Sequence, residues 1–271
     1  MTTNPAILYP RLLLTGAAGA LGRMLRPRLK AHCQTLRVSD ISELEAAKTG
    51  EEVMPALALQ DAQAVDKLLD GVDGVVHLGG VSIERPFDEI LPANIVGMYN
   101  LYEAARKNGT RRIVFASSNH VTGFYKQSET VSPTMPVRPD GYYGLSKAFG
   151  ENIARFYFDR YGIETVCLRI GSSIPEPKDR RMLATWLSYD DLERLVLASL
   201  SAPVVGFSVI YGMSDNLAVW WDNASAKHLG YQPKDTSAVF KNAIESRQLS
   251  LDLNDPAVIY QGGGFVKNAP I

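Results

Sequence analysis

A short apolar run near the N-terminus ends in a glycine-rich turn, and this feature constrains the fold most. Residues 11–15 predict a buried strand, and residues 21–31 have the apolar spacing of a helix. Between them lie Gly16, Gly19 and Gly22. Glycines at a strand-to-helix turn let the backbone approach a pyrophosphate, whose negative charge is favoured at a helix N-terminus. The spacing differs from the G-x-G-x-x-G pattern, so a tight turn without a ligand is the alternative.

Strands and helices alternate from residue 36 to residue 170. Strands that are apolar on both faces are typical of a parallel sheet covered by helices on both sides. The alternation therefore predicts a doubly wound α/β fold of the Rossmann type, whose ligands bind beyond the carboxyl ends of the strands. Beyond the first strand and helix, we expect strands at 36–39, 72–78, 112–117 and 165–170, and helices at 61–69, 93–107 and 146–161.

An acidic residue directly follows the second predicted strand. Asp40 lies about 20 residues beyond the glycine turn, where a carboxylate can accept hydrogen bonds from the ribose hydroxyls of NAD. The same carboxylate repels the 2′-phosphate of NADP, so we expect NAD as the cofactor, although Arg37 is close in sequence. The alternative role of Asp40 is that of a surface turn residue.

The alternation loosens after the last of these strands. Prolines become frequent, and a helix near 190–201 and a strand near 204–211 are the clearest elements. We therefore predict an NAD-binding Rossmann-like core over residues 1–171 and a small C-terminal substrate-binding lobe over residues 172–271, packed on the same domain. In this lobe Ser188 begins an S-x-x-D sequence, which predicts a helix start rather than a site.

Composition narrows the class of protein. The 271 residues include 28 Lys and Arg and 29 Asp and Glu, for a net charge of −1, and 46% are apolar. These values exclude a disordered chain and a nucleic-acid binder attracted by positive charge. No run approaches the roughly 18 apolar residues of a membrane span, and no signal peptide is recognisable, so we expect a cytoplasmic protein. The low net charge favours a homo-oligomer. Cys33 and Cys167, each alone in sequence, predict neither a disulfide framework nor a metal site.

Tyr143 and Lys147 are four residues apart at the start of the predicted helix that ends at Tyr161. Side chains at this spacing share one helix face. The pKa of tyrosine, about 10, falls by roughly 1–3 units beside a positive charge, which would let the phenol act as a general base. A single Tyr and Lys at this spacing more often belong to an amphipathic face. Ser118, at the carboxyl end of an upstream strand, adds a hydroxyl for a reacting oxygen and favours the catalytic interpretation.

In this order the motifs resemble those of the short-chain dehydrogenase/reductase superfamily, extended type, over nearly the whole chain. The resemblance implies that Tyr143 is the catalytic acid/base, that Ser118 contacts the reacting oxygen and that Lys147 binds the nicotinamide ribose. The cofactor site that it implies, including Tyr143 and Lys147, contains Gly16, Gly19, Ala20, Leu21, Gly22, Asp40, Leu59, Leu78, Gly79 and Ile170.

Several segments spread along the chain are similar to the bacterial uronate dehydrogenase family. That resemblance implies NAD-dependent oxidation of D-glucuronate and D-galacturonate at C1, the hemiacetal carbon, to the aldarolactone. The segments are 77–82, 115–120, 169–172, 175–177, 181–182, 220–222 and 261–263. The residues that would line the sugar site are Ser82, Ser118, Asn119, His120, Tyr143, Ser172 and Arg181.

We hypothesise that the Tyr143 phenolate removes the C1 hydroxyl proton while hydride leaves C1 for the nicotinamide. Arg181 would bind the C6 carboxylate, because its planar fork matches that anion; a solvated charge cluster with Asp179 and Arg180 is the alternative. Many extended members have an acidic residue for adenine where this chain has Ala58, so adenine would be held by the backbone or by the nearby Asp61.

Two other classes of function remain open at the level of sequence. A nucleotide-sugar epimerase or dehydratase with retained NAD has the same motifs, but such enzymes usually have a larger C-terminal lobe. The dehydratases also usually have an acidic residue after the serine, where this chain has Asn119. An NAD-binding redox regulator would be expected to lack one of Ser118, Tyr143 and Lys147, and all three are present.

Overall fold

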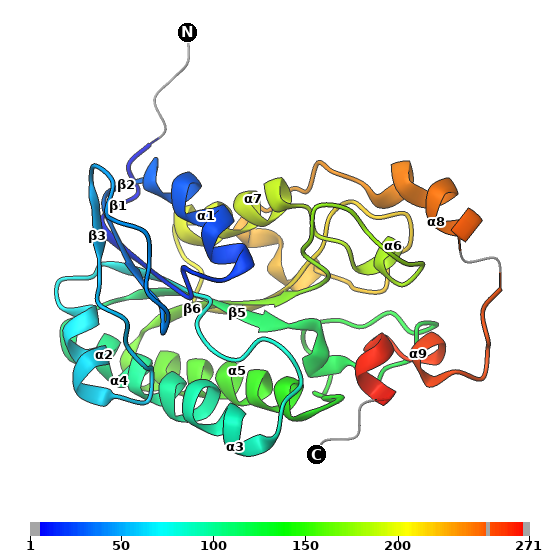
Figure 1. Cartoon of the computed structure of the whole chain (residues 1–271), viewed down its shortest axis with the longest axis horizontal. Coiled ribbons are helices and arrows are strands. Elements are labelled where there is room, and N and C mark those ends of the chain that lie inside the picture. The colour runs from blue at the N-terminus through cyan, green and yellow to red at the C-terminus, as the bar shows by residue number, and fades with distance from the viewer. Residues whose placement is uncertain (1–5, 248–249, 268–271) are drawn as a thin grey trace, which may run out of the picture.

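The computed structural model describes residues 6–247 and 250–267, which form three layers around one sheet (Figure 1). Seven parallel strands run in the order β3-β2-β1-β4-β5-β6-β7, which confirms the predicted doubly wound sheet. The strands are β1 (Tyr9–Thr15), β2 (Cys33–Ser39), β3 (Glu51–Val53), β4 (Gly74–His77), β5 (Arg112–Ser118), β6 (Glu164–Ile170) and β7 (Phe207–Gly212).

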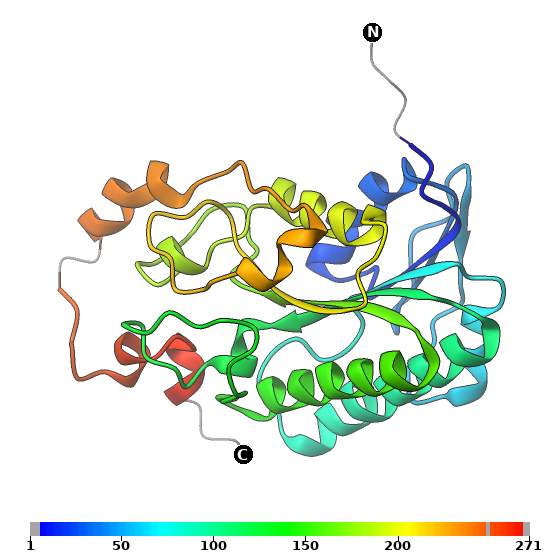
Figure 2. The same cartoon turned by 180° about the vertical axis from the view of Figure 1, so that it is seen from behind.

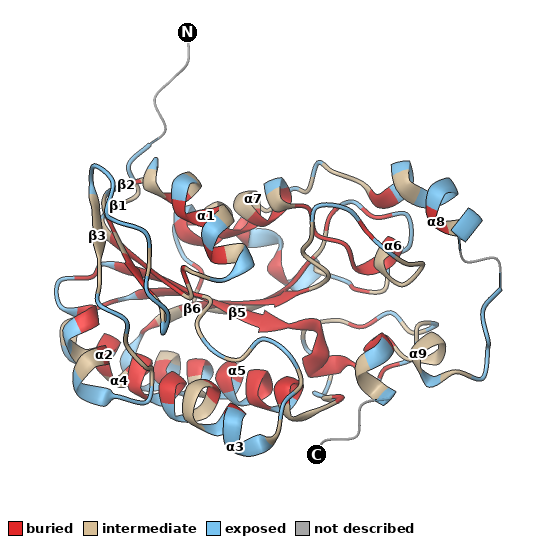
Figure 3. Ribbon diagram, viewed as in Figure 1, coloured by how far each residue is buried: buried red, intermediate tan, exposed pale blue. Residues whose placement is uncertain are grey.

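Helices cover both faces of the sheet, as Figures 1 and 2 show from opposite sides. α1 (Ala20–Lys30) and α7 (Tyr189–Ser201) pack on one face. α2 (Ala62–Leu69), α4 (Gly97–Asn108) and α5 (Tyr142–Tyr161) pack on the other. Figure 3 shows the central strands buried between these two layers, whereas the edge strand β3 is half-buried. The short elements are α3 (Phe87–Ile90), η1 (Leu91–Val96), η2 (Asn119–Thr122), α6 (Met182–Thr185), η3 (Ala224–Leu229), η4 (Ser237–Phe240), α8 (Lys241–Arg247), α9 (Pro256–Ile259) and η5 (Gly263–Lys267).

Strand β1 explains why the first apolar run is continuous. Leu12 and Leu14 lie in the apolar core under α1 and α7, whereas Leu13 lies in the core under α2, α4 and α5. Successive side chains of a strand point to opposite faces, so a strand covered on both sides needs apolar residues at every position. All three leucines are fully buried.

Several elements differ from the sequence prediction. β2 begins at Cys33 and not at 36, and the helix predicted at 93–107 consists of η1 followed by α4 from Gly97. β3 was not predicted, because this edge strand has three residues, two of them glutamates, and carries no apolar pattern. α5 begins at Tyr142 and not at 146, so Tyr143 and Lys147 both lie inside the helix. β7 begins at Phe207, three residues later than the predicted start at Val204.

The C-terminal segment contributes to the main layers as well as to the cleft. β7 extends the sheet beside β6, and α7 packs under it, although both elements follow residue 171. The start of α7 is confirmed as a cap, because Ser188 Oγ accepts a hydrogen bond from Asp191 N at 2.9 Å. The division into parts at residue 171 stays a prediction. Among the described residues, no helix is long and apolar enough to cross a membrane.

Candidate active site

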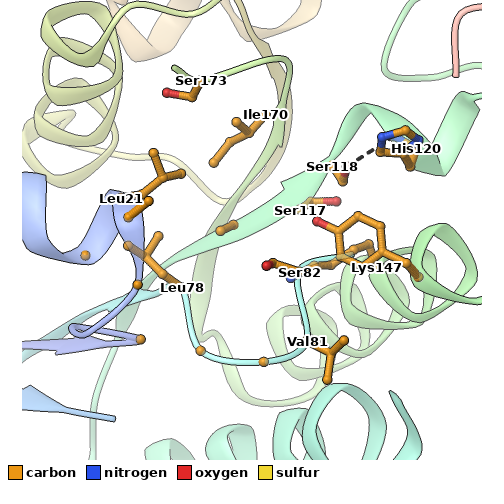
Figure 4. Close-up of a pocket in the computed structure, with 18 of the residues that line it drawn as sticks. Leu21, Leu78, Val81, Ser82, Ser117, Ser118, His120, Lys147, Ile170 and Ser173 are labelled. Carbon is orange, nitrogen blue, oxygen red and sulfur yellow. Dashed lines mark hydrogen bonds between the residues drawn. The ribbon is translucent and has the colours of Figure 1, made fainter. Parts of the chain in front are cut away.

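A cleft of about 870 Å³ opens at the carboxyl edge of the sheet, where β1 and β4 lead into loops on opposite faces (Figure 4). In a doubly wound sheet this reversal of strand order is the place where ligands bind. Figure 4 shows Ser82, Ser118 and Lys147 around one part of the cleft, with Leu21 and Leu78 farther along it.

The glycine turn packs so closely that two of its positions exclude any side chain. Gly16 has φ +70°, and a Cβ there would lie 2.7 Å from the carbonyl carbon of Leu78. A Cβ on Gly22 would lie 2.1 Å from the carbonyl oxygen of Gly16. The first glycine therefore permits the turn, and the third lets α1 pack on it. The result is a helix N-terminus that faces the cleft, which suits a pyrophosphate.

Asp40 holds the other side of this turn. Its Oδ2 accepts a hydrogen bond from Ala18 N and its Oδ1 accepts one from Ser42 N, both at 2.9 Å. Each carboxylate oxygen has a second lone pair, so the residue can still accept from ribose hydroxyls. Arg37 points elsewhere, because its guanidinium donates to Glu52 and to the carbonyls of Leu68 and Asp70. Asp40 is therefore the charged residue at this end of the described cleft. Its negative charge favours NAD over NADP, because it repels the 2′-phosphate of NADP.

The adenine end of the cleft is lined by Leu57, Leu59 and Gln60. Asp61, one of the two predicted adenine contacts, caps α2 instead: its Oδ1 accepts hydrogen bonds from Gln63 N and Ala64 N. Asp61 does not line the described cleft, whereas Leu57, Leu59 and Gln60 do, so of the two sources expected for adenine the backbone is the better placed.

His77, to which the sequence assigned no role, lies beneath the cofactor side of the cleft. Its Nδ1 is 2.7 Å from Thr15 Oγ1, which also accepts a hydrogen bond from Gly79 N. Burial, with a smaller contribution from the charge of Lys147, lowers the pKa of His77 to about 3. A neutral imidazole therefore supports the loop that contains Gly79. No local sequence pattern predicts the contact between His77 and Thr15.

Tyr143 and Lys147 are both buried on the same face of α5. Lys147 Nζ lies 5.6 Å from the Tyr143 ring centroid and 5.0 Å from the Phe115 ring centroid. Burial lowers the pKa of Lys147 to about 8. The pKa of Tyr143 is raised to about 12, and burial is the largest cause. A hydrogen bond with Ser118 opposes the rise, and the charge of Asp140 makes a smaller contribution to it. The expected lowering of the Tyr143 pKa by Lys147 is thus wrong for this structure, because desolvation outweighs an ammonium that faces the ring.

Two residues hold the loop after β4 against the start of α5. Both carboxylate oxygens of Glu84 accept backbone hydrogen bonds, from Tyr142 N at 2.8 Å and Tyr143 N at 2.9 Å. Asn94 accepts from Val81 N, and its amide nitrogen donates to the Val81 carbonyl and to Ser146 Oγ. Glu84 was missed by the sequence analysis, because it lies 58 residues before its first partner.

His120 forms a buried pair with Asp140 on the sugar side of the cleft. Its Nδ1 lies 2.7 Å from Asp140 Oδ2, and its ring stacks on Phe265 with centroids 3.8 Å apart. Because an ionised carboxylate can only accept, the proton of this hydrogen bond lies on Nδ1. A Cβ on Gly123 or Gly262 would lie within 2.0 Å of Asp140 Oδ2, so glycines make room for the carboxylate. Asp140 and Phe265 were not predicted.

Arg181 points into the same cleft, and three neighbours hold its guanidinium. Nε donates to the Gln261 carbonyl at 2.7 Å, and Nη1 lies 3.4 Å from Ser172 Oγ. Nη2 donates to Asn119 Oδ1 at 2.8 Å, with the amide turned so that its nitrogen donates to the Ile170 carbonyl. Burial lowers the pKa of Arg181, so the cation is poorly solvated and favours an anionic partner.

The structure brings the predicted site residues together. Each of them lines the cleft, from the glycine turn to the sugar side, and their roles toward a cofactor or a sugar stay predictions. They are Gly16, Gly19, Ala20, Leu21, Gly22, Asp40, Leu59, Leu78, Gly79, Ser82, Ser118, Asn119, His120, Tyr143, Lys147, Ile170, Ser172 and Arg181. Lining residues that the sequence analysis did not single out include Val81, Ser173, Met182, Gly264 and Phe265.

A doubly wound sheet with a glycine turn and with Ser118, Tyr143 and Lys147 at its carboxyl edge defines a class of dinucleotide-binding enzymes. The family described as NAD dependent epimerase/dehydratase matches residues 12–191. A uronate dehydrogenase of Pseudomonas syringae pv. tomato is 56% identical over 97% of this chain and 95% of its own length.

Solved structures agree with this match. Uronate dehydrogenase from Agrobacterium tumefaciens, crystallised as a Tyr-to-Ala mutant complexed with NAD, is 51% identical with a TM-score of 0.94 over 97% of this chain and 99% of that one. A glucuronic acid dehydrogenase from Chromohalobacter salexigens is also 51% identical, with a TM-score of 0.94 over 96% of this chain and 97% of that one. The chain therefore belongs to the uronate dehydrogenases, within the NAD dependent epimerase/dehydratase family.

Proposed function

We propose that this protein oxidises D-glucuronate and D-galacturonate at C1 to the corresponding aldarolactones, with NAD as the hydride acceptor. The observation that carries the proposal is the convergence of Tyr143, Lys147 and the half-buried Arg181 on one cleft. A proton acceptor and an anion receptor in the same cleft suit a substrate with a C1 hydroxyl and a C6 carboxylate. The family to which the chain belongs supports the same reaction.

The cleft fits a dinucleotide. Cβ atoms are excluded at Gly16 and Gly22, which lets a pyrophosphate approach the start of α1, and Asp40 is available for the adenosine ribose. Lys147 would contact the nicotinamide ribose. When bound, NAD supplies the electrophilic carbon that accepts hydride from C1.

Tyr143 acts as the base in this proposal. It takes the proton of the C1 hydroxyl, while the hydrogen on C1 leaves with its electron pair and the hemiacetal becomes a lactone. Because burial raises its pKa to about 12, the phenolate needs added stabilisation. The hydrogen bond with Ser118 already opposes that rise, and Lys147 supplies positive charge from the same helix face.

Arg181 orients the sugar by its carboxylate. A guanidinium binds a planar anion through two parallel N–H groups, which is stronger and more directional than a lysine contact. Ser82, Asn119, His120 and Ser172 would then contact the ring hydroxyls between the two ends.

The direct test mixes the protein with NAD and D-glucuronate and follows nicotinamide absorbance. We expect stoichiometric reduction of NAD and formation of a lactone, with weaker turnover of neutral hexoses. Tightly bound NAD without net reduction, together with conversion of a nucleotide sugar, would instead identify an epimerase or dehydratase. We further propose a cytoplasmic homo-oligomer, which sedimentation of the purified protein tests.

A further inference from the structure

Gln261 is buried and fully hydrogen-bonded, although it contributes no side-chain atom to the cleft. It lies in the C-terminal segment 260–265, which Figures 1 and 2 show beside the loop after β5. The residue is 1% exposed. Its Oε1 accepts from Trp221 Nε1 at 2.9 Å, and its Nε2 donates to the carbonyls of Lys126 at 3.1 Å and Glu129 at 2.8 Å. Its backbone N donates to the Tyr125 carbonyl at 2.8 Å.

The backbone carbonyl of this anchored residue holds Arg181. It accepts a hydrogen bond from Arg181 Nε at 2.7 Å. Gly263 has φ +63°, and a Cβ there would lie 2.5 Å from Arg181 Cδ. The C-terminal segment therefore contacts both the aliphatic stem and the Nε atom of Arg181. Without this segment, Arg181 would keep only its contacts with Ser172 and Asn119 at the terminal nitrogens.

Counting donors shows what this contact leaves free. A guanidinium has five N–H groups. Nε uses its one on Gln261, Nη1 has Ser172 within 3.4 Å, and Nη2 donates to Asn119. Counted over the described residues, one N–H on each terminal nitrogen is left to donate to an anion such as a carboxylate.

We propose that Gln261 is a positioning residue for recognition of the sugar carboxylate. Its side chain locks its own backbone to the loop after β5 and to Trp221, so that its carbonyl fixes the plane of the Arg181 fork. This inference rests on the proposed function, because it assigns Arg181 to the substrate carboxylate. A residue that merely fastened the C-terminal segment would affect all substrates alike.

The test compares Gln261→Ala with Gln127→Ala as a matched control. Gln127 also ties the same loop to the same segment, because its Nε2 donates to the carbonyls of Ala257 and Tyr260, but it does not contact Gln261 or Arg181. For Gln261→Ala we expect KM for D-glucuronate to rise about tenfold. A change of this size corresponds to the loss of roughly one aligned, charge-assisted hydrogen bond between Arg181 and the sugar carboxylate. We expect kcat and the dissociation constant of NAD to stay within about twofold, and Gln127→Ala to leave all three near wild type.

A double-mutant cycle gives the second readout. With Arg181→Ala already present, Gln261→Ala should add no further rise in KM for D-glucuronate, because its effect passes through the missing guanidinium. Additive effects would overturn the proposal, as would equal losses in Gln261→Ala and Gln127→Ala. If the alanine variant fails to fold, Gln261→Met keeps the side-chain volume and is judged by the same two criteria. Wild-type protein that does not reduce NAD with uronates would refute the proposed function instead, and so the two failures are distinguishable.

Discussion

Burial shifts the pKa values of three ionisable residues in or beneath the cleft. It shifts His77 and Lys147 toward their neutral forms, with pKa values of about 3 and about 8, and it raises the pKa of Tyr143 to about 12. A spacing of four residues shows that Tyr143 and Lys147 share a helix face, but it does not show how much water reaches them. The sequence therefore placed the pair correctly on one helix face and gave the wrong direction for the pKa of the tyrosine.

Replacing Tyr143 by Phe removes the phenolic oxygen and keeps the ring beside His120 and Phe265. We expect kcat to fall by about 10³-fold, the usual contribution of a general base, with NAD affinity nearly unchanged. Steady-state kinetics and a fluorescence titration with NAD measure the two quantities. Tyr142→Phe on the next position of α5 is the control and should retain activity. A Tyr143→Phe variant with near-normal kcat would exclude the tyrosine as the base.

Replacing Arg181 by Ala removes the proposed receptor for the sugar carboxylate. KM for D-glucuronate should rise about 100-fold, because two charge-assisted hydrogen bonds are lost, whereas KM for neutral hexoses should change little. Arg181→Lys should recover a minor part of the loss, since an ammonium cannot match the fork. Kinetics with both classes of sugar make the comparison, and the neighbouring Arg180→Ala serves as the control. Equal effects on acidic and neutral sugars would remove Arg181 from the carboxylate role.

Helix α5 illustrates how elements cooperate at the site. It presents Tyr143 and Lys147 from its first turns, and its N-terminus is capped by Glu84 from a loop in a different part of the chain. Negative charge at a helix N-terminus is favourable, and the two backbone N–H groups would otherwise lack a partner. The same loop contains Ser82, so one carboxylate aligns the tyrosine with a predicted substrate contact.

Replacing Glu84 by Ala tests this coupling. Loss of the cap should lower the free energy of unfolding by about 1 kcal/mol, which urea denaturation measures. We also expect kcat for uronate oxidation to fall, because the first turn of α5 loses its link to the loop after β4. Exposed Glu89→Ala on α3 is the matched acidic control. Unchanged stability and kcat in Glu84→Ala would show that the cap is dispensable.

The helices and strands that could be predicted from the sequence are those with a recognisable pattern in consecutive residues. The continuous apolar runs of β1, β5 and β6 and the Ser188 cap of α7 are visible in a few consecutive residues, and the structure confirms them. β3 was missed because pairing with β2 creates it, and its three residues have no apolar pattern of their own. Glu84, Asp140 and Gln261 were missed for a related reason, since each works through a partner that the fold brings near.

At the scale of the whole molecule, we expect the free energy of unfolding to depend on pH through the buried, neutral His77. Its ordinary pKa of about 6.5 falls to about 3 in the fold. Between these values the unfolded chain binds a proton at His77 that the folded chain does not. The contribution of His77 to the free energy of unfolding is therefore fully present above pH 6.5 and is lost as the pH falls toward 3.

A pH series of urea unfolding tests this linkage. From pH 6.5 downward, His77 should contribute a decrease of at most about 1.4 kcal/mol per pH unit in the free energy of unfolding. Carboxylates contribute to acid unfolding as well, so the informative quantity is the difference between wild type and His77→Asn, which cannot be protonated there. The difference should shrink as the pH falls. A difference that is constant from pH 7 to pH 4 would contradict the assigned burial of a neutral imidazole.

Local patterns in the sequence determined the layers of this protein, the glycine turn and the helical Tyr143–Lys147 pair, because each depends on the spacing of neighbouring residues. Tertiary structure alone decided the depth of the cleft, the pKa values of its residues and the seat of Arg181. The physical reason is that desolvation and long-range hydrogen bonds arise from segments such as 261–265 and 126–129, which meet only after the sheet has formed.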